Sequence, residues 1–333
     1  MKLVTSCMLA GLAGLSIPLS PAHGFDTRAE FPTRPIRWIV PFPPGGSNDV
    51  LARYVGMKLT DRLKEQVVID NRGGANGIIG TELASRQTPD GYTLLMVSTS
   101  YVMNAAVRSL PYDVDKSFDP VATIGSSPNS IVVNPGGRFA TLRDLIDAAK
   151  AKPASINYAS TGVGGFNHFG GELFKKMAGI DMVMIAYKGG GPAMIDVMAG
   201  QVPVMFSSLT QVLPHVRSGK LKVLAIGAPQ RSPVVPDIPT VAESGYPGYE
   251  VAVWWGVVAP AGVAAGPLNV LRREIAAVLA DPATQERLKG DAAQPLVMSP
   301  DDMRRMIRAD VLKWTGVART AGIHIPTTTQ AAR

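Results

Sequence analysis

The sequence predicts an α/β protein with mainly parallel sheets and with helices on both faces of each sheet. Short apolar strands alternate with amphipathic helices through most of the chain, which is the pattern of parallel strands joined by crossover helices. Glycine-rich polar loops follow several of these strands. Ligands of such sheets bind beyond the carboxyl ends of the strands, so the loops point to one shared cleft.

Residues 1–24 have the pattern of a signal peptide. Lys2 precedes an apolar run at 8–15, and Ala22-His23-Gly24 offers small residues at the two positions that a signal peptidase requires. A membrane anchor needs about 20 unbroken apolar residues, and Pro18 interrupts this run too early. Export would remove Cys7, the only cysteine, so the mature chain is expected to lack disulfides, thiolate metal sites and cysteine nucleophiles.

Size and charge narrow the function further. After a cut near residue 24, about 309 residues remain, enough for one large or two medium domains. The formal net charge of +7 is modest, and the basic residues are scattered along the chain without a basic and aromatic stripe. Nucleic-acid binding needs basic residues gathered on one face, so we expect no nucleic-acid partner and only a general attraction for small anions.

The first three strand–loop–helix units occupy residues 36–107. Strands at 36–40, 67–69 and 92–97 are apolar and are each followed by a polar loop. Apolar residues then recur at helical spacing, as Leu51, Val55 and Leu59 do after the first loop. The expected helices are 51–63, 78–85 and 101–107.

The pattern changes near residue 118. Short strands are expected at 121–124 and 130–133, followed by a helix at 142–151 with Thr141 as its N-cap. Two more strands, 156–159 and 182–186, lead into glycine-rich loops and helices that end near 177 and 199. After a strand at 251–258 the chain is mainly helical, and Ser299-Pro300-Asp301-Asp302 has the N-cap, proline and early acids of a helix start.

The loop after the first strand predicts an anion site. Gly45 and Gly46 let the backbone approach a ligand closely, and the helix that follows directs free N–H groups and its positive dipole end to the same place. Ser47 and Asn48 either contact the ligand or act as an ordinary helix N-cap, and the two roles are compatible.

Five blocks of sequence together resemble one family. They are Phe31-Pro32-Thr33-Arg34-Pro35-Ile36-Arg37 leading into Val40-Pro41-Phe42-Pro43-Pro44-Gly45-Gly46-Ser47-Asn48-Asp49, then Asn71-Arg72-Gly73-Gly74-Ala75-Asn76-Gly77, Thr88-Pro89-Asp90-Gly91-Tyr92-Thr93, Tyr187-Lys188-Gly189-Gly190-Gly191-Pro192-Ala193 and Pro236-Asp237-Ile238-Pro239-Thr240-Val241-Ala242-Glu243. In this order they resemble the solute receptors of tripartite tricarboxylate transporters, the Bug or TctC family. The resemblance spans nearly the whole chain after residue 24.

The resemblance implies a periplasmic binding protein of type II, with two α/β lobes that close on a small carboxylated solute and deliver it to a membrane permease. It implies that the chain crosses between the lobes near Ser127 and near Val251. The first lobe would then comprise 25–126 and 252–333, and the second lobe 127–251. A monomer without cofactor or metal is expected, located in the periplasm.

The expected ligand contacts combine this resemblance with the polar loops. Ser98 and Thr99 end a strand, and Ser160 and Thr161 precede a glycine-rich turn that suits a second carboxylate. Asn76 is also an ordinary turn former, and a lone histidine at a helix start is more often a packing residue. The predicted ligand-binding residues are Phe42, Pro43, Gly45, Gly46, Ser47, Asn48, Asn76, Ser98, Thr99, Ser160, Thr161, Phe166, Asn167, His168, Tyr187 and Ser207.

The block Val204-Met205-Phe206-Ser207-Ser208 departs from the family pattern, since many relatives carry Asp-Asn after that phenylalanine. An aspartate there would pair with a ligand ammonium group, so Ser207 argues against amino-acid ligands. This expectation favours organic acids without a positive group.

An enzyme and a sensor are the alternatives. The chain has no Gly-x-Ser-x-Gly elbow, no phosphate-binding Gly-x-x-x-x-Gly-Lys-Ser/Thr loop and no histidines at metal-ligand spacing, so we expect no catalytic residues. A closed receptor can also dock on a two-component sensor kinase instead of a permease. The residues do not distinguish these two outputs.

Overall fold

The computed structural model describes residues 31–323 and shows an α/β fold of two lobes. The predicted signal peptide and Cys7 lie outside these residues. The strands form one path in the order β2-β1-β3-β9-β4-β7-β5-β6, with β8 and β10 both paired to β4. None of the helices within 31–323 is long and apolar enough to cross a bilayer.

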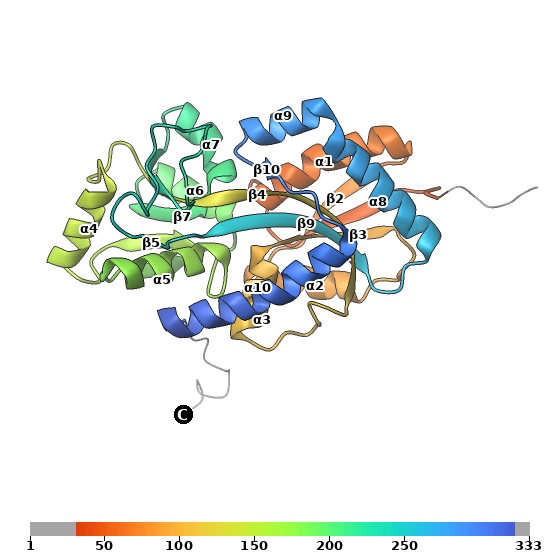
Figure 1. Ribbon diagram of the computed structural model, residues 1–333, viewed down its shortest axis with the longest axis horizontal. Helices are drawn as coiled ribbons and strands as arrows, with labels where there is room; N and C mark the ends of the chain where they lie inside the picture. The colour runs from red at the N-terminus through yellow and green to blue at the C-terminus, as the bar shows by residue number, and fades with distance from the viewer. Residues whose placement is uncertain (1–30, 324–333) are drawn as a thin grey trace, which may run out of the picture. The chain divides into compact units, whose positions relative to one another are not determined.

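The first lobe is built on three parallel strands. β1 lies between β2 and β3, and four of its five side chains are fully buried, which is typical of a strand covered on both faces. Helices pack on both sides of this sheet (Figure 1). The elements are β1 (Ile36–Val40), α1 (Ser47–Leu63), β2 (Val67–Asn71), the 3₁₀ turn η1 (Ala75–Gly77), α2 (Ile78–Ser85), β3 (Thr93–Ser98) and α3 (Thr99–Val107).

Two long strands connect the lobes. β4 (Phe118–Val133) pairs antiparallel with β9 (Ala252–Pro260) as far as Pro128, and from Asn129 onward it pairs with β7 in the second lobe. The expectation of two separate strands, 121–124 and 130–133, was wrong. The intervening Gly-Ser-Ser-Pro-Asn has the composition of a turn, but its backbone is held in the sheet by β9 and β10.

The second lobe repeats the parallel pattern with β5 between β6 and β7, while β4 pairs antiparallel with β7 and β8. The predicted parallel strands are therefore the cores of two mixed sheets, joined by the antiparallel pair β4 and β9. The elements are α4 (Leu142–Ala151), β5 (Asn157–Ser160), α5 (Phe166–Ala178), β6 (Val183–Ala186), α6 (Gly190–Met198), β7 (Val204–Ser208), α7 (Leu209–Arg217) and β8 (Lys222–Ile226).

The predicted capping of two helices is confirmed. Thr141 accepts a hydrogen bond from the backbone N–H of Asp144, whose side chain in turn accepts from the Thr141 N–H, so the two form a capping box at the start of α4. Ser299 accepts from the N–H of Asp302 at the start of α10 (Pro300–Ala321). Before α10 come α8 (Ala265–Ala280), α9 (Pro282–Gly290) and the short β10 (Gln294–Pro295).

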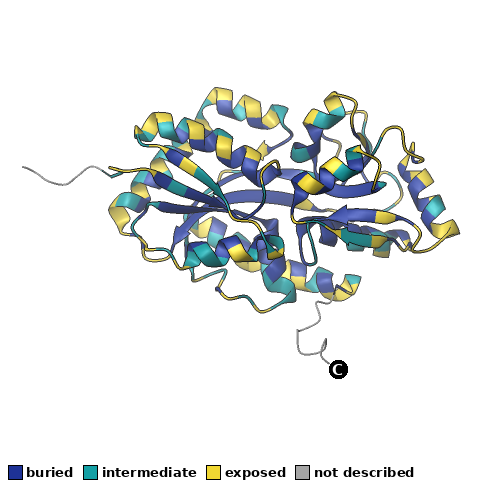
Figure 2. Cartoon of the chain, turned by 180° about the vertical axis from the view of Figure 1, so that it is seen from behind, coloured by how far each residue is buried: buried dark blue, intermediate teal, exposed yellow. Residues whose placement is uncertain are grey.

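Helix α10 contacts both lobes. It packs along α3 of the first lobe and reaches α5 of the second, where the rings of Trp314 and Phe169 meet edge to face with centroids 5.5 Å apart. Both rings are fully or almost fully buried. Figure 2 shows buried residues along the strands and the inner faces of the helices, with exposed residues on the outer helical faces.

Candidate functional site

A small cavity between the two lobes gathers the loops that follow the parallel strands. Its volume of about 30 Å³ holds roughly one water molecule. None of the described residues that line it has a charged side chain. The lining residues are Phe42, Gly46, Ser47, Asn48, Ser98, Ser100, Thr161, Phe166, Asn167, Gly190, Ser208, Gln211 and Val253.

Five helices begin at this cavity. Two of them, α1 and α3, belong to the first lobe, and α5, α6 and α7 belong to the second. The first backbone N–H groups of a helix lack partners within the helix, and its amino end carries a partial positive charge. The cavity is therefore electropositive without a cationic side chain. The N-cap residues are Gly46, Ser98, Gly165, Gly189 and Ser208.

The glycine loop before α1 is held in place by Asp49. This buried carboxylate accepts a hydrogen bond from the Gly45 N–H at 3.0 Å, another from the Asn71 amide at 2.9 Å, and pairs with Arg53 at 2.9 Å. Burial alone would raise the pKa of Asp49, but the bonds from Arg53, Gly45 and Asn71 outweigh burial and hold the pKa below its usual value. Asn71 also donates to the Phe42 carbonyl, so the loop is fixed at both ends.

Two buried amide atoms at the cavity have no hydrogen-bond partner among residues 31–323, Asn48 Oδ1 and Gln211 Nε2. The N-cap of α1 is Gly46 and makes no side-chain cap, so Ser47 and Asn48 lie inside the helix and do not serve as its N-cap. An unpaired buried polar atom costs stability, so each of these atoms marks a group that a ligand can satisfy. Gln211 Nε2 is a donor for an acceptor such as a carboxylate, whereas Asn48 Oδ1 is an acceptor that needs a hydroxyl or a water.

Hydrogen bonds join the lobes beside the cavity. The Phe166 N–H at the start of α5 donates to Ser100 Oγ at 3.1 Å. The Thr161 hydroxyl donates to Asn76 Oδ1 at 3.2 Å. Each bond links a second-lobe residue to a first-lobe residue, so the lobes are in contact around the cavity, in a closed arrangement.

Two further contacts also show that the lobes touch each other. Arg108 at the end of α3 donates to the Val163 carbonyl of the second lobe at 2.5 Å. A Cβ added to Gly191 would lie 2.7 Å from the Pro44 carbonyl oxygen, nearer than real Cβ atoms come. The two glycine-rich loops meet because neither carries a side chain at this point.

Eight of the sixteen predicted ligand residues line the cavity: Phe42, Gly46, Ser47, Asn48, Ser98, Thr161, Phe166 and Asn167. Asn76 lines a smaller cavity next to it, which shares Phe42 and Ser98 with the first. Pro43 and Gly45 belong to the glycine loop but do not line the cavity. The Asn167 amide is directed to the Phe206 carbonyl, with which it forms a hydrogen bond.

The remaining predicted residues do not line this cavity. Thr99 Oγ1 accepts from the Trp254 N–H at 2.9 Å, and the Tyr187 hydroxyl donates to Asp196 at 2.7 Å. Ser160 is fully buried, with its hydroxyl 3.4 Å from the Gly162 carbonyl.

His168 and Ser207 support residues at the cavity rather than lining it. His168 Nδ1 accepts from the Gly164 N–H at 3.2 Å and so stabilises the turn before α5, and burial lowers the pKa of this histidine. Ser207 donates to Gln211 Oε1 at 3.2 Å, and this bond orients the Gln211 amide.

Sequence reasoning did not place five lining residues in the ligand set: Ser100, Gly190, Ser208, Gln211 and Val253. The serines directly follow predicted contacts, and Gly190 lies in a loop that the sequence singled out, so the signal was present. Gln211 and Val253 carried no such signal, because one lies inside a helix and the other within a strand.

Comparison with known proteins gives one consistent result. The model of the tripartite tricarboxylate transporter family receptor matches residues 51–323. Protein BugT of Bordetella pertussis is 39% identical over 313 residues, which cover 93% of this chain and 94% of BugT.

Solved structures agree in fold. An R. palustris protein solved with adipate is 33% identical, with a TM-score of 0.85, over 88% of this chain and 99% of that protein. The periplasmic binding protein BugD has the same identity, TM-score and coverage. MatC from Rhodopseudomonas palustris with bound malate is 27% identical, with a TM-score of 0.82, over 86% of this chain and 99% of MatC.

Proposed function

The chain belongs to the receptor family of the tripartite tricarboxylate transporters, and we propose that it is a periplasmic receptor for a small organic acid. In this proposal it captures a di- or tricarboxylate or a related acid between its lobes and delivers it to the permease subunits of a tripartite transporter. It acts as a binding protein and not as an enzyme.

The observation that carries this proposal is the uncharged cavity at five helix starts. Backbone N–H groups and hydroxyls converge there, together with Gln211 Nε2, which has no hydrogen-bond partner in the described part of the chain. Such a set favours an anion. The relatives solved with adipate and malate hold acids of the proposed class.

Uncharged donors are strong enough for this task. A hydrogen bond to a charged partner contributes about 1.5–3 kcal/mol. Several such bonds reach the roughly 8 kcal/mol of micromolar binding even after the ligand has been immobilised. No arginine clamp is required, and bridging waters can fill positions that a given acid leaves open.

The cavity in the described arrangement is too small for an organic acid, since it holds about 30 Å³. The lobes must therefore separate to admit the ligand and close again around it, a hinge motion about the strands that connect them. We place the changeover between lobes near Ser127 and Val251. β4 changes its partner from β9 to β7 between Pro128 and Asn129, and β9 begins at Ala252, which supports this division.

A thermal-shift screen of the purified protein against mono-, di- and tricarboxylates, aromatic acids and amino acids tests the proposal. A ligand at 100 times its Kd stabilises the folded state by about 2.7 kcal/mol, a readily measured rise in Tm. Gly46→Leu should remove the shift, because the new side chain would enter the cavity. The φ of Gly46 is −83°, a value that leucine adopts without strain, so the variant should still fold. Gly266→Leu on α8, where the surroundings are open, is the control.

If no carboxylate raises Tm, the protein does not bind organic acids and the proposed function is wrong. Tight binding of aspartate or glutamate, with no response to plain dicarboxylates, would instead contradict the preference that Ser207 predicts.

A further inference from the structure

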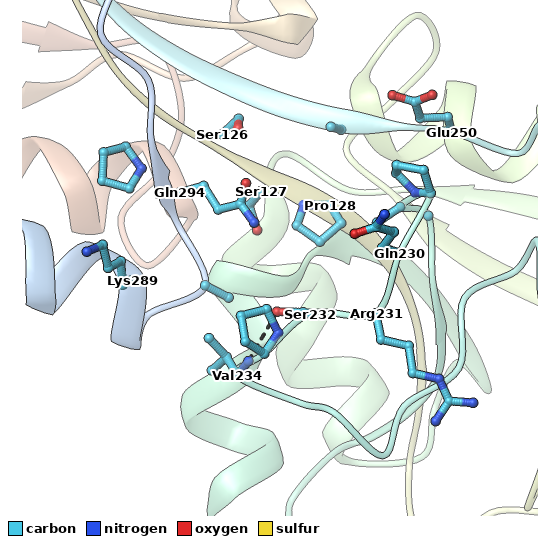
Figure 3. A pocket seen from close by; sticks show the side chains of 17 residues that line it. Ser126, Ser127, Pro128, Gln230, Arg231, Ser232, Val234, Glu250, Lys289 and Gln294 are labelled. Atoms are coloured by element: carbon cyan, nitrogen blue, oxygen red, sulfur yellow. Dashed lines mark hydrogen bonds between the residues drawn. The ribbon is translucent and has the colours of Figure 1, made fainter.

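A second and much larger cavity lies behind the strands that connect the lobes (Figure 3). Its volume is about 600 Å³, within the roughly 300–1,000 Å³ of small-molecule sites. It shares no lining residue with the small cavity between the lobes that contains Gly46, Asn48 and Gln211, which we now call the carboxylate cavity after its proposed ligand. We refer to it as the hinge cavity.

The walls of the hinge cavity come from both lobes. Lys289, at the end of α9, and Gln294 of β10 form the wall on the first-lobe side, and the segment 227–234 after β8 forms the opposite wall. Between them the cavity is bounded by Ser126–Pro128 of β4 and by Ala252 of β9. Any rotation of one lobe against the other about these strands changes its width.

The two cavities lie on opposite faces of β9. Ala252 lines the hinge cavity, and the next residue, Val253, lines the carboxylate cavity. Neighbouring side chains in a strand point to opposite faces of the sheet. A rotation that closes one side of the connecting strands therefore opens the other. In the described arrangement the cavity on the Val253 side of β9 has a volume of about 30 Å³ and the cavity on the Ala252 side about 600 Å³.

The lining indicates what the hinge cavity would bind. Its surface is mainly apolar, formed by Pro128, Pro229, Pro233, Val234, Pro295 and three alanines. Among residues 31–323, Lys289 forms no ion pair, whereas Arg231 is paired with Glu243 at 2.9 Å. Glu250 is on the opposite side of the cavity from Lys289 in Figure 3 and disfavours a second acid there.

We propose that the hinge cavity is a second ligand site, for a compact apolar molecule with one acidic group, and that its occupancy favours closure of the lobes. The acid faces Lys289 and the apolar body contacts the proline-rich wall. In this proposal the hinge cavity narrows when the lobes separate, so its ligand binds the closed form more tightly. Linkage then requires that each ligand tighten the binding of the other. The coupling between the two ligands rests on the proposed organic-acid function, whereas the hinge site itself does not.

The first test uses anilinonaphthalene sulfonate, an apolar aromatic fluorophore with one sulfonate. We expect it to bind the folded protein one to one. Ala228→Trp and Ala252→Trp, which fill the hinge cavity from a wall and from β9, should each abolish this binding, and Lys289→Gln should weaken it. Ala276→Trp, an exposed position on α8, is the matched control. Failure to bind, or binding that both cavity variants leave unchanged, would refute the site.

The second test measures closure without any carboxylate. Ile79 and Ile195 are exposed and lie on α2 and α6, one on each lobe. Helix α6 begins at the small cavity between the lobes, and α2 begins at the smaller cavity next to it. Nitroxide labels at Ile79→Cys and Ile195→Cys, with Cys7→Ser, report their separation by pulsed electron spin resonance. The fluorophore, or either tryptophan variant alone, should shorten the distance distribution. An unchanged or longer distance would disprove the coupling to closure.

The coupling itself is measured as a change in carboxylate affinity. Both tryptophan variants should lower the Kd of the acid found in the thermal screen by about fivefold, at the lower end of typical allosteric coupling. Unchanged or weaker binding would count against the proposal. If no acid binds at all but the fluorophore still closes the lobes, the organic-acid function fails and the hinge site stands.

Discussion

At the scale of single residues, Asn48 shows how the site separates binding from stability. Its side chain lies in the first turn of α1 and is 9% exposed, and its Oδ1 beside the cavity has no hydrogen-bond partner within residues 31–323. A negative charge at a helix start stabilises the helix, but the same charge beside a bound carboxylate repels it.

We therefore predict that Asn48→Asp changes the two properties in opposite directions. The free energy of unfolding without ligand should stay the same or rise by about 0.3–1 kcal/mol, as for acidic residues at helix starts. Carboxylate binding should weaken by about tenfold or more, since tenfold corresponds to only 1.4 kcal/mol. Chemical denaturation and titration calorimetry measure these quantities.

Asn269→Asp is the matched control, because it adds the same charge at an exposed position early in α8. It should leave carboxylate binding unchanged. If Asn48→Asp binds the acid as tightly as the unaltered protein does, the carboxylate does not lie beside α1.

The sequence was sufficient to single out loop residues that line the cavity, but not the residues that packing brings there. The segment 42–48 was recognisable because glycines before a helix have a local physical use, and four of its residues line the cavity. Gln211 and Val253 reach the cavity only because α7 and β9 are placed there by the sheet, and neither has a local signature. Conversely, Thr99 looked like a contact, but its hydroxyl bonds the backbone of β9.

At the scale of elements, the loop between β1 and α1 depends on one carboxylate. Asp49 joins the Gly45 N–H, Asn71 and Arg53, and its pKa lies below the ordinary value of 3.8. A carboxyl group whose pKa is lower in the folded state stabilises the protein above its unfolded-state pKa. That stabilisation is lost as the pH falls through the folded-state pKa.

We predict that Asp49→Asn lowers stability in a pH-dependent way. At neutral pH the free energy of unfolding should fall by about 1–2 kcal/mol, because hydrogen bonds to a charged group are lost. The difference from the unaltered protein should shrink as the pH falls below 3.8, the ordinary value at which the unfolded chain takes up the proton, and should vanish below the lower folded-state pKa of Asp49. Tm measured across this range checks the prediction, and Asp61→Asn on the exposed side of the same helix is the control. A difference that does not depend on pH would exclude the charge as its cause.

Element boundaries followed from the sequence where local signals agreed. The helix at 142–151 was predicted with its bounds and its cap, since Thr141 and Asp144 form a capping box that is encoded within four residues. β4 was predicted as two strands because glycine, serine and proline at 125–128 are turn formers in isolation. Pairing with β9 and β10 overrides that local preference, and such long-range pairing leaves no trace in a single short segment.

At the scale of the whole molecule, alternating strands and helices and the order of the five sequence blocks were enough to predict the two-lobed fold. The state of the lobes was not predictable, because a closed and an open arrangement share the same elements and differ only in contacts between them. These contacts include the hydrogen bonds from Phe166 to Ser100 and from Arg108 to Val163.

Gly191 offers a direct test of closure, and we predict that Gly191→Ala weakens ligand binding without weakening the fold. The new Cβ would lie 2.7 Å from the Pro44 carbonyl of the other lobe, so the closed arrangement has to shift, while separated lobes have no such clash. Alanine is favoured over glycine within a helix by about 0.5–1 kcal/mol, so the unliganded protein should be as stable as before or more stable. Carboxylate affinity should fall by about tenfold, and the labels on α2 and α6 should stay farther apart with ligand present.

Gly266→Ala, in open surroundings on α8, should change neither affinity nor distance. Unchanged affinity in Gly191→Ala would mean that the liganded receptor does not bring its two glycine-rich loops into contact.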